Sequence, residues 1–350
     1  MSRATIKDVA EAAGVSIATV SRVLNDRGGA SATARTVREA AERLGYAPNA
    51  LARMLITQRS MTVGLLQPMV SDSFAGQVLD GVEDAAYELG YSVIVCSTGA
   101  GSSRLEHYAR LLASRQVDAA VVMSTALTQT QHELLRALAL PYVVVAGSTP
   151  DPGVPVVAID GQQAAADATT ALVTAGHRRI GMIAGGADDP VAGIPRVRGF
   201  VAACDTAGIA PDDRPVEHGD FGYDSGLVAM RRLLERRPDL TAVFAASDEM
   251  AVAAMTVADE QGRRVPEDLS VIGFDAIPLA RMTRPPLVSV AQPLRAMGYR
   301  AMQAAEQLVR GEPLPAAAPV AHALTVGGTV GPPSGGPPFG DPVGPPSPRS

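Results

Sequence analysis

Arg22 has the sequence surroundings of a side chain that contacts nucleic-acid bases. It lies in a run where Val20, Val23 and Leu24 recur at the spacing of one buried helical face, which leaves Arg22 on the opposite, exposed face. A guanidinium can pair with both acceptor atoms on the major-groove edge of a guanine. The residue types therefore predict base recognition by Arg22, with contact to phosphate alone as the alternative.

The other exposed side chains near Arg22 are small or apolar. Ile17 and Ala18 can touch a thymine methyl group, but neither can donate a hydrogen bond to a base. Short polar side chains suit phosphate groups, and such contacts position a protein on DNA without reading its sequence. Ser16 has a second interpretation, because a serine at the start of a helix also serves as its cap. The predicted DNA contacts of this small polar kind are Thr5, Ser16, Thr19, Ser21, Asn25 and Ser31.

Two short helices joined at a glycine must hold these side chains. Thr5 followed by Asp8 has the form of a capping box, which begins a helix. Gly14 ends that helix, because glycine adopts the left-handed C-cap without steric strain. Ser16 can begin the second helix almost at once. Such a helix-turn-helix is the arrangement that places its second helix in the major groove.

These residues resemble the signature of the LacI/GalR family of bacterial transcription regulators. A third helix over about residues 32–44, which Ser31 begins and Gly45 ends, is expected to follow. The resemblance implies an all-α DNA-binding domain at residues 1–58, with a hinge helix at about 49–57. The matching phrases are Asp8-Val-Ala, Ala13-Gly-Val-Ser16, Thr19-Val-Ser-Arg-Val-Leu-Asn25 and Tyr46-Ala-Pro-Asn49-Ala-Leu-Ala-Arg53-Met-Leu55.

The resemblance implies two further DNA contacts in the hinge, Asn49 and Leu55. In the family, a leucine in this context wedges between base pairs from the minor groove, which costs a few kcal/mol of base unstacking per step. A hinge with that role is stable only on DNA, or in a dimer in which two hinges pack together. The alternative is that Leu55 belongs to the core of a lobe.

Charge is divided unevenly along the 350 residues. Residues 1–60 contain nine Lys and Arg against five Asp and Glu, while the remaining chain contains 21 against 31. A basic N-terminal part on an acidic body fits a protein that meets phosphates only at one end. The two cysteines, Cys96 and Cys204, lie in apolar or helical runs and indicate buried thiols in a reducing compartment. With no apolar membrane span and no signal sequence, we expect a cytoplasmic protein.

After residue 60 short apolar runs alternate with amphipathic stretches, which predicts parallel strands connected by helices. Strands and helices in alternation imply doubly wound sheets. About 270 residues of this pattern predict two similar α/β lobes. The expected strands are 62–66, 92–96, 118–123, 142–145, 156–159, 180–183, 242–245, 269–274 and 287–290.

The family resemblance implies how this part is arranged. It implies a periplasmic-binding-protein-like domain for effector binding and dimerisation over residues 61–326. One lobe would comprise 61–160 with 293–320 and the other 161–292 with 321–330, with a ligand in the cleft between them. The phrases that carry the resemblance are Ala175-Gly-His-Arg-Arg-Ile180, Arg196-Val-Arg-Gly-Phe200, Ser247-Asp-Glu-Met-Ala251, Val265-Pro-Glu-Asp-Leu-Ser-Val-Ile-Gly-Phe-Asp275 and Pro285-Pro-Leu287.

Two aromatic residues are candidates for effector contact. Phe74 follows the first strand, and ligands bind at the carboxyl ends of strands in α/β sheets. Phe221 matches a family position where a ring stacks on the ligand, and its alternative is a place in the core.

Three charged residues match positions that hydrogen-bond the effector in the family: Arg196, Asp248 and Asp275. A guanidinium and carboxylates suit sugar hydroxyls, because both make charge-assisted hydrogen bonds. Several relatives have asparagine where this chain has Ser247, so the hydroxyl pattern that it recognises can differ. The alternative for Asp248 is a helix-capping carboxylate.

The sequence favours a homodimeric, effector-controlled repressor that binds a pseudo-palindromic DNA operator and takes a sugar as its effector. The alternative is an activator, or a repressor that needs a corepressor such as a sugar or nucleobase. No hydrolase, zinc-protease or phosphate-loop motif is present, and the five histidines lack metal-ligand spacing. We therefore expect neither an enzyme nor a cofactor or metal.

Residues 327–350 contain seven glycines and eight prolines. Such a composition buries too little apolar surface to offset chain entropy. The sequence therefore predicts a disordered tail from residue 327.

Overall fold

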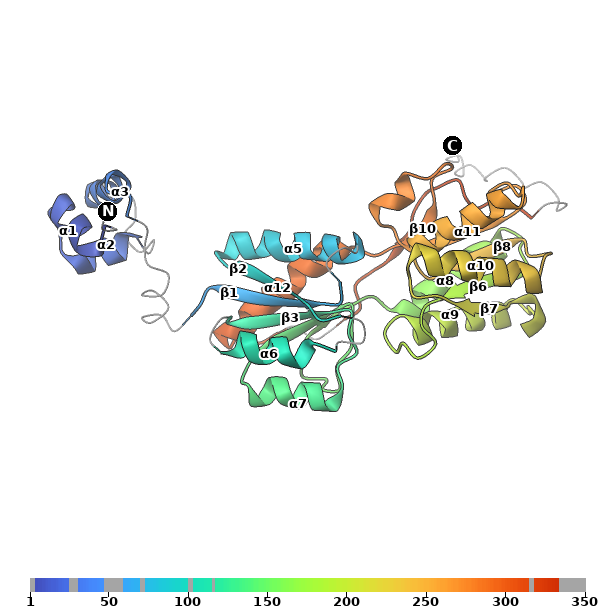
Figure 1. Cartoon of the computed structure of the whole chain (residues 1–350), viewed down its shortest axis with the longest axis horizontal. Helices are drawn as coiled ribbons and strands as arrows, with labels where there is room; N and C mark the ends of the chain where they lie inside the picture. Colours follow the sequence, from blue (N-terminus) through green and yellow to red (C-terminus); the bar gives the residue numbers. More distant parts are fainter. Residues whose placement is uncertain are drawn as a thin grey trace, which may run out of the picture. The chain divides into compact units, whose positions relative to one another are not determined.

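The computed structural model describes residues 4–24, 31–46, 59–69, 73–99, 103–114, 117–314 and 318–333. These residues divide into a small helical unit, which ends at Thr62, and a larger α/β unit that holds nearly all of the remaining chain (Figure 1). The predicted fold class, an all-α domain followed by α/β lobes, is confirmed. No helix among the described residues is long and apolar enough to cross a membrane.

The helical unit contains three described helices: α1 spans Ile6–Ala13, α2 spans Ile17–Leu24 and α3 spans Ala32–Arg43. Their apolar faces meet in one small core of valine and alanine, in which small side chains let the short helices approach closely. The core residues are Val9, Ala10, Val20, Val23, Ala34, Val37, Ala40 and Ala41.

Local caps set the ends of these helices. The Asp8 carboxylate accepts hydrogen bonds from the backbone N–H of Thr5 at 2.7 Å and from its hydroxyl at 2.9 Å. Gly14 ends α1 in the left-handed region with a φ of 63°. The Ser31 hydroxyl oxygen accepts from the Ala34 N–H at 3.2 Å and so begins α3, as the sequence predicts.

The first sheet of the α/β unit has the strand order β2-β1-β3-β4-β5. Its strands are β1 (Thr62–Gln67), β2 (Ser92–Ser97), β3 (Ala119–Met123), β4 (Tyr142–Val145) and β5 (Val156–Val157). The pairings of β1 with β3, β3 with β4 and β4 with β5 are all parallel, so the carboxyl ends of these strands share one edge. The helices α6 (Leu105–Ala113) and α7 (Gln129–Ala137) lie together beside this sheet (Figure 1).

A late helix completes this lobe. α12 (Leu294–Arg310) packs against α5 (Ser73–Leu89), although about 200 residues separate them in sequence. Two glycines allow the close approach: a Cβ on Gly81 would lie 1.9 Å from the Arg295 carbonyl oxygen, and one on Gly298 would lie 2.0 Å from that of Val78. Any larger residue at either position would push the helices apart.

The second sheet has the order β11-β10-β9-β8-β6-β7. Its strands are β6 (Ile180–Ala184), β7 (Val216–His218), β8 (Ala242–Ala245), β9 (Ser270–Asp275), β10 (Val288–Ala291) and β11 (Ala323–Leu324). All neighbours are parallel except β11, which pairs antiparallel with β10. Short β7 and β11 were not predicted, because neither has an apolar run.

Four α-helices and two short 3-10 helices accompany this sheet in the described part of the chain. Phe200, Phe244 and Phe274 form the centre of its core, with adjacent ring centroids 6.5 and 6.3 Å apart. The helices are α8 (Gly161–Thr174), α9 (Gly193–Thr206), α10 (Tyr223–Arg236), α11 (Asp248–Glu260), η2 (Pro211–Asp213) and η3 (Pro278–Arg281).

The prediction of disorder from residue 327 is wrong for residues 327–333, which pack on the second sheet. Thr329 is completely buried, and its carbonyl oxygen accepts from the Val271 N–H at 2.8 Å. Its hydroxyl donates to the Val271 carbonyl at 2.7 Å. A Cβ on Gly327 would lie 2.6 Å from the Pro286 carbonyl oxygen, so glycine permits this close approach. Composition misjudged the segment because hydrogen bonds to the second sheet hold it, together with the packing of Val330 on the core. Residues 334–350 lie outside the described range.

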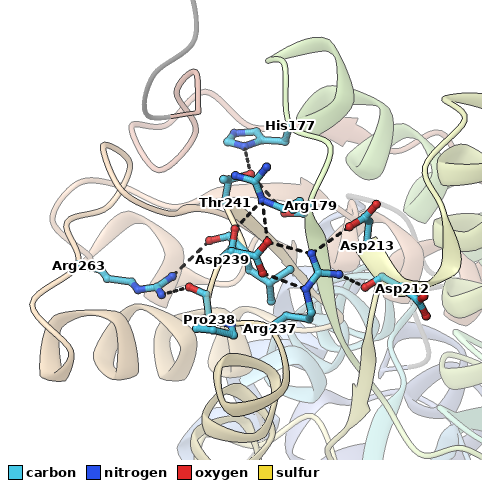
Figure 2. Close-up of polar contacts among 10 residues, drawn as sticks. His177, Arg179, Asp212, Asp213, Arg237, Pro238, Asp239, Thr241 and Arg263 are labelled. Carbon is cyan, nitrogen blue, oxygen red and sulfur yellow. Dashed lines mark hydrogen bonds and ion pairs between the residues drawn. The ribbon is translucent and has the colours of Figure 1, made fainter.

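His177 connects this C-terminal segment by hydrogen bonds to the edge of the second sheet where its parallel strands begin. Its Nε2 lies 2.9 Å from the Gly331 carbonyl oxygen, and its Nδ1 lies 2.9 Å from the Thr241 hydroxyl oxygen. Because a carbonyl can only accept, Nε2 carries the proton. Figure 2 shows the same edge, where Arg237 pairs with both Asp213 and Asp239 at 2.9 Å.

The buried His177 predicts a loss of stability in acid. Burial lowers the pKa of His177 below its usual 6.5. Between the two pKa values, His177 is therefore protonated in the unfolded chain and neutral in the folded chain. We therefore expect the free energy of unfolding to be highest above about pH 6.5, to decrease as the pH falls below that value, and to level off below the folded pKa. Urea unfolding of wild type and His177→Gln at pH 7.5 and 5.5 measures this, and the variant is expected to lose less stability.

His107→Gln is the matched control, since His107 is an exposed histidine of α6. It should keep the acid sensitivity of the wild type. If His177→Gln shows the full wild-type loss, another group causes it.

Candidate DNA-reading helix and effector site

The exposed face of α2 carries the side chains predicted to read DNA. Ile17 is 44% exposed and Ala18 and Arg22 are also exposed, whereas Val20 and Val23 are buried. The helix thus buries its valines in the core and leaves Arg22 accessible. The geometry allows the predicted base contact, because a guanidinium on an exposed helix face can reach a groove edge.

Several of the small polar candidates hold the helices themselves. The Ser16 hydroxyl oxygen accepts from the Thr19 N–H at 3.1 Å and lies 2.9 Å from the Thr19 hydroxyl, so Ser16 caps α2. Ser31 begins α3 in the same way, whereas at the start of α1 the backbone N–H and the hydroxyl of Thr5 donate to the Asp8 carboxylate. Exposed caps at helix starts also present N–H groups suited to phosphate. Ser21 is partly buried on α2.

The remaining predicted DNA contacts lie outside the described residues. These are Asn25, Asn49 and Leu55, together with the hinge at 49–57.

Arg196 is the centre of the predicted effector site. Arg196 belongs to α9 and is only 8% exposed to solvent. Its guanidinium carbon lies 3.7 Å from the centroid of the Phe274 ring. One terminal nitrogen lies 3.7 Å from Oδ1 of Asp275, and another donates to the Ala246 carbonyl oxygen. Burial lowers the pKa of Arg196, and the nearby Asp275 carboxylate opposes that shift. Among the described residues, its Nε has no hydrogen-bond partner.

Asp275 ends β9 in an unusual backbone conformation. Its φ is 102° and that of the next residue, Ala276, is 53°, both in the region that favours glycine. Gln292, just after β10, donates to the Asp275 carboxylate at 2.7 Å. Residues other than glycine hold such angles only where surrounding structure enforces them, and such strain gathers at ligand sites.

Phe221 joins the same edge of the sheet and is also strained, with a φ of 73°. Its ring centroid lies 5.7 Å from the Arg196 guanidinium carbon. The Ser247 hydroxyl donates to the Phe221 carbonyl at 2.7 Å and fixes the turn. A Cβ on Gly185 would lie only 2.1 Å from the ring, so glycine makes room for Phe221. Its ring is therefore part of this edge, although it also contacts the core.

Asp248, a predicted effector contact, lies in the interior of the fold. Asp248 is completely buried at the first position of α11, and Ser247, not Asp248, caps that helix. Its Oδ2 accepts from the Ile277 N–H at 2.7 Å and its Oδ1 accepts from the Ser289 hydroxyl at 2.5 Å. Burial raises the pKa of Asp248 to about 6, and these donors oppose the rise. Asp248 therefore positions the turn that carries Asp275, and its predicted contact with the effector stays a prediction.

Phe74 occupies the second position of α5, close after β1 of the first sheet, and is partly buried. The structure brings Arg196, Phe221 and Asp275 together at one edge of the second sheet. The contact of Phe74 with the effector stays a prediction.

Sequence reasoning missed Gln292 and Phe274. Gln292 is the polar residue that directly follows an apolar strand, which is a usable signal for a site at the carboxyl edge. Phe274 gave no such signal, because a phenylalanine inside a strand is usually core. The described residues contain no cluster of His, Cys, Asp and Glu that could hold a metal ion.

An exposed helix-turn-helix face and a separate α/β unit with a charged edge define a DNA-binding regulator. A model described as "Bacterial regulatory proteins, lacI family" matches residues 5–49, and a periplasmic-binding-protein-like domain matches residues 169–330. Catabolite control protein A of Priestia megaterium is 37% identical over 300 residues, which cover 85% of this chain and 90% of that protein. The HTH-type transcriptional regulator CelR of Thermobifida fusca is 39% identical over 318 residues, which cover 89% of this chain and 93% of that protein.

Solved structures agree with these relatives. A complex of the transcriptional regulator CelR with cellobiose superposes with a TM-score of 0.72 at 36% identity, covering 93% of this chain and 100% of that one. The lac repressor dimer bound to operator and the anti-inducer ONPF gives a TM-score of 0.83 at 26% identity, covering 94% and 99%. The chain belongs to the LacI family of bacterial transcription regulators. It is a DNA-binding regulator and not an enzyme.

The buried Asp248 carboxylate gives a stability prediction. Asp248→Ala leaves the Ile277 N–H and the Ser289 hydroxyl without an acceptor in a dry site, so we expect a loss of about 3 kcal/mol in the free energy of unfolding. Urea denaturation monitored by circular dichroism measures the loss. Asp224→Ala, which removes an exposed first-turn aspartate from α10, is the control and should change stability little. Equal small losses in both variants would contradict the positioning role.

Proposed function

We propose that the protein is a homodimeric repressor that binds a pseudo-palindromic DNA operator and is controlled by a small-molecule effector, most simply a sugar. The observation that carries the effector half is the strained, buried pair of Arg196 and Asp275 beside Phe221. A guanidinium and a carboxylate at the carboxyl edge of a parallel sheet suit vicinal hydroxyls, and an aromatic ring suits the apolar face of a sugar. The cellobiose held by CelR and the ribose named for a regulator from Enterococcus faecium support this class of ligand.

The DNA half rests on α2. Two copies of the helix-turn-helix related by a two-fold axis would occupy half-sites of matching symmetry, so a dimer implies a pseudo-palindromic operator. Arg22 would read a guanine, Ile17 and Ala18 would touch thymine methyl groups, and the caps Thr5, Ser16 and Ser31 with Thr19 and Ser21 would meet phosphates. In the hinge, Asn49 and Leu55 would add minor-groove contacts.

Effector binding would alter the DNA affinity through the α/β unit. Such coupling between two sites is typically about 1–3 kcal/mol. Release of DNA by the effector makes the protein an inducible repressor, and promotion of DNA binding makes the effector a corepressor. The proposed place of action is the cytoplasm, where the operator is.

Arg22→Ala tests base reading. Loss of a bidentate guanine contact should weaken operator binding by about 1–3 kcal/mol and leave binding to random DNA nearly unchanged. Fluorescence anisotropy with labelled operator and scrambled duplexes at fixed salt measures both. Arg43→Ala, at the exposed end of α3, is the control and should weaken the two duplexes equally if it acts at all. Equal losses on both duplexes for Arg22→Ala would assign that residue to phosphate.

Asp275→Asn tests the effector site. The amide keeps an oxygen to accept from Gln292 but removes the charge beside Arg196, so folding should survive while effector affinity falls by about tenfold or more. A thermal-shift screen of wild type against sugars and nucleobases identifies the ligand, and titration of that ligand gives the affinity of each variant. Arg231→Ala breaks the exposed Arg231–Glu260 pair instead and should bind normally. Wild-type affinity in Asp275→Asn would refute the assignment.

A further inference from the structure

The side chain of Gln67 is buried but makes no hydrogen bond to the described residues. Gln67 is the last residue of β1 and is only 1% exposed. Its backbone carbonyl oxygen accepts from the Thr98 N–H at 2.8 Å and from the Thr98 hydroxyl at 3.2 Å, so the main chain is satisfied. Neither Nε2 nor Oε1 of the side chain has a hydrogen-bond partner in the described part of the chain. A buried amide in this state is destabilising, which makes glutamine a poor structural choice at this position.

The surroundings of Gln67 have the features of a ligand-binding edge. The carboxyl ends of β1, β3 and β4 lie at one edge of the first sheet. Ser124 follows β3 and Ala146 follows β4, and both have a φ of 49° in the region that favours glycine. The same strain marks Asp275 and Phe221 at the corresponding edge of the second sheet. Backbone strain of this kind persists where function requires it.

Nearby hydroxyl groups are already committed as donors. The Thr98 hydroxyl donates to the Gln67 carbonyl, and the Thr125 hydroxyl donates to the Met123 carbonyl at 3.0 Å. These bonds leave no hydroxyl hydrogen of Thr98 or Thr125 for Oε1 of Gln67. A hydrogen-bond donor for Oε1 of Gln67 must therefore be a group other than the hydroxyls of Thr98 and Thr125.

A second buried amide lies on the helix that follows β1. Nε2 of Gln77 is buried and has no hydrogen-bond partner among the described residues. Gln77 lies three positions after Phe74 on α5, so the two share one helical face. The amide of Gln67 and the amide nitrogen of Gln77, both without a hydrogen-bond partner among the described residues, therefore lie before and after Phe74 in the sequence.

We propose that Gln67 determines effector specificity by hydrogen-bonding a group that both donates and accepts, such as a sugar hydroxyl or the lactam edge of a nucleobase. A carboxamide offers two N–H donors and one acceptor oxygen, so a ligand group with both functions satisfies it completely. An anionic group would satisfy Nε2 and leave Oε1 unpaired. The three side-chain torsions of glutamine at the end of a strand let the amide turn to the edge of the sheet when a ligand arrives. This inference rests on the proposed effector binding and extends it to the first lobe.

Gln67→Met in the full chain tests the proposal, because methionine keeps the length of the side chain and removes both polar atoms. Without effector, the variant should melt at the wild-type temperature or higher, since an unpaired buried amide is lost. With effector, its dissociation constant should rise about tenfold, as expected for loss of paired hydrogen bonds that leaves the ligand group unsatisfied. Thermal shift and isothermal titration are run with cellobiose, ribose, hypoxanthine and uracil, which separate the saccharide source from the nucleobase source.

Gln163→Met is the matched control, since Gln163 is an exposed glutamine of α8 that donates to Asp167. It should bind the effector as the wild type does. A lower melting temperature of Gln67→Met without effector would show that the amide has structural partners and would overturn the proposal. Unchanged affinity of Gln67→Met for a compound that Asp275→Asn fails to bind would overturn it while leaving the proposed function intact. Absence of binding by wild type to all four compounds would overturn both.

Discussion

The enclosure of the Arg196 guanidinium is the constraint on which the second lobe depends. A charge removed from water needs a partner and a polarisable neighbour, and here the ring of Phe274 lies beneath it while Asp275 lies beside it. To bring the carboxylate there, the chain leaves β9 through two residues with positive φ. Asp248 then holds that turn from behind by accepting from Ile277 and Ser289. The strained edge is thus a consequence of a buried charge, and its rigidity is suited to orienting a polar ligand.

The corresponding edge of the first sheet buries a neutral polar side chain instead of charged ones. Ser124 and Ala146 also leave their strands with positive φ, but the buried polar side chain at that edge is Gln67. An uncharged amide can remain buried without a partner at a smaller penalty than a charge, so the lobe stays folded without a ligand. One edge therefore offers charged groups and the other offers an amide.

The helical unit depends on caps rather than on a large core. Its buried residues are only valines and alanines, so the hydrogen bonds at Thr5, Ser16 and Ser31 contribute a large share of its order. These same residues lie at helix starts, where N–H groups suit phosphate. The structural caps are therefore also the residues proposed to contact DNA phosphates. Ile17, Ala18 and Arg22 are exposed on α2, and they are the side chains of this helix that are proposed to contact bases.

The amino-acid sequence by itself determined the helix-turn-helix and the alternation of strands and helices, while its resemblance to the LacI/GalR family supplied the candidate residues Arg196, Phe221 and Asp275. Helical and strand periods, caps and glycine stops are local, so they can be read without coordinates. Tertiary structure alone decided which polar residues are buried. It enclosed Asp248 within the turn of β9, left the Gln67 amide without a partner, and drew residues 327–333 onto the second sheet. These outcomes depend on hydrogen bonds between residues tens of positions apart, whose geometry no local pattern or composition contains.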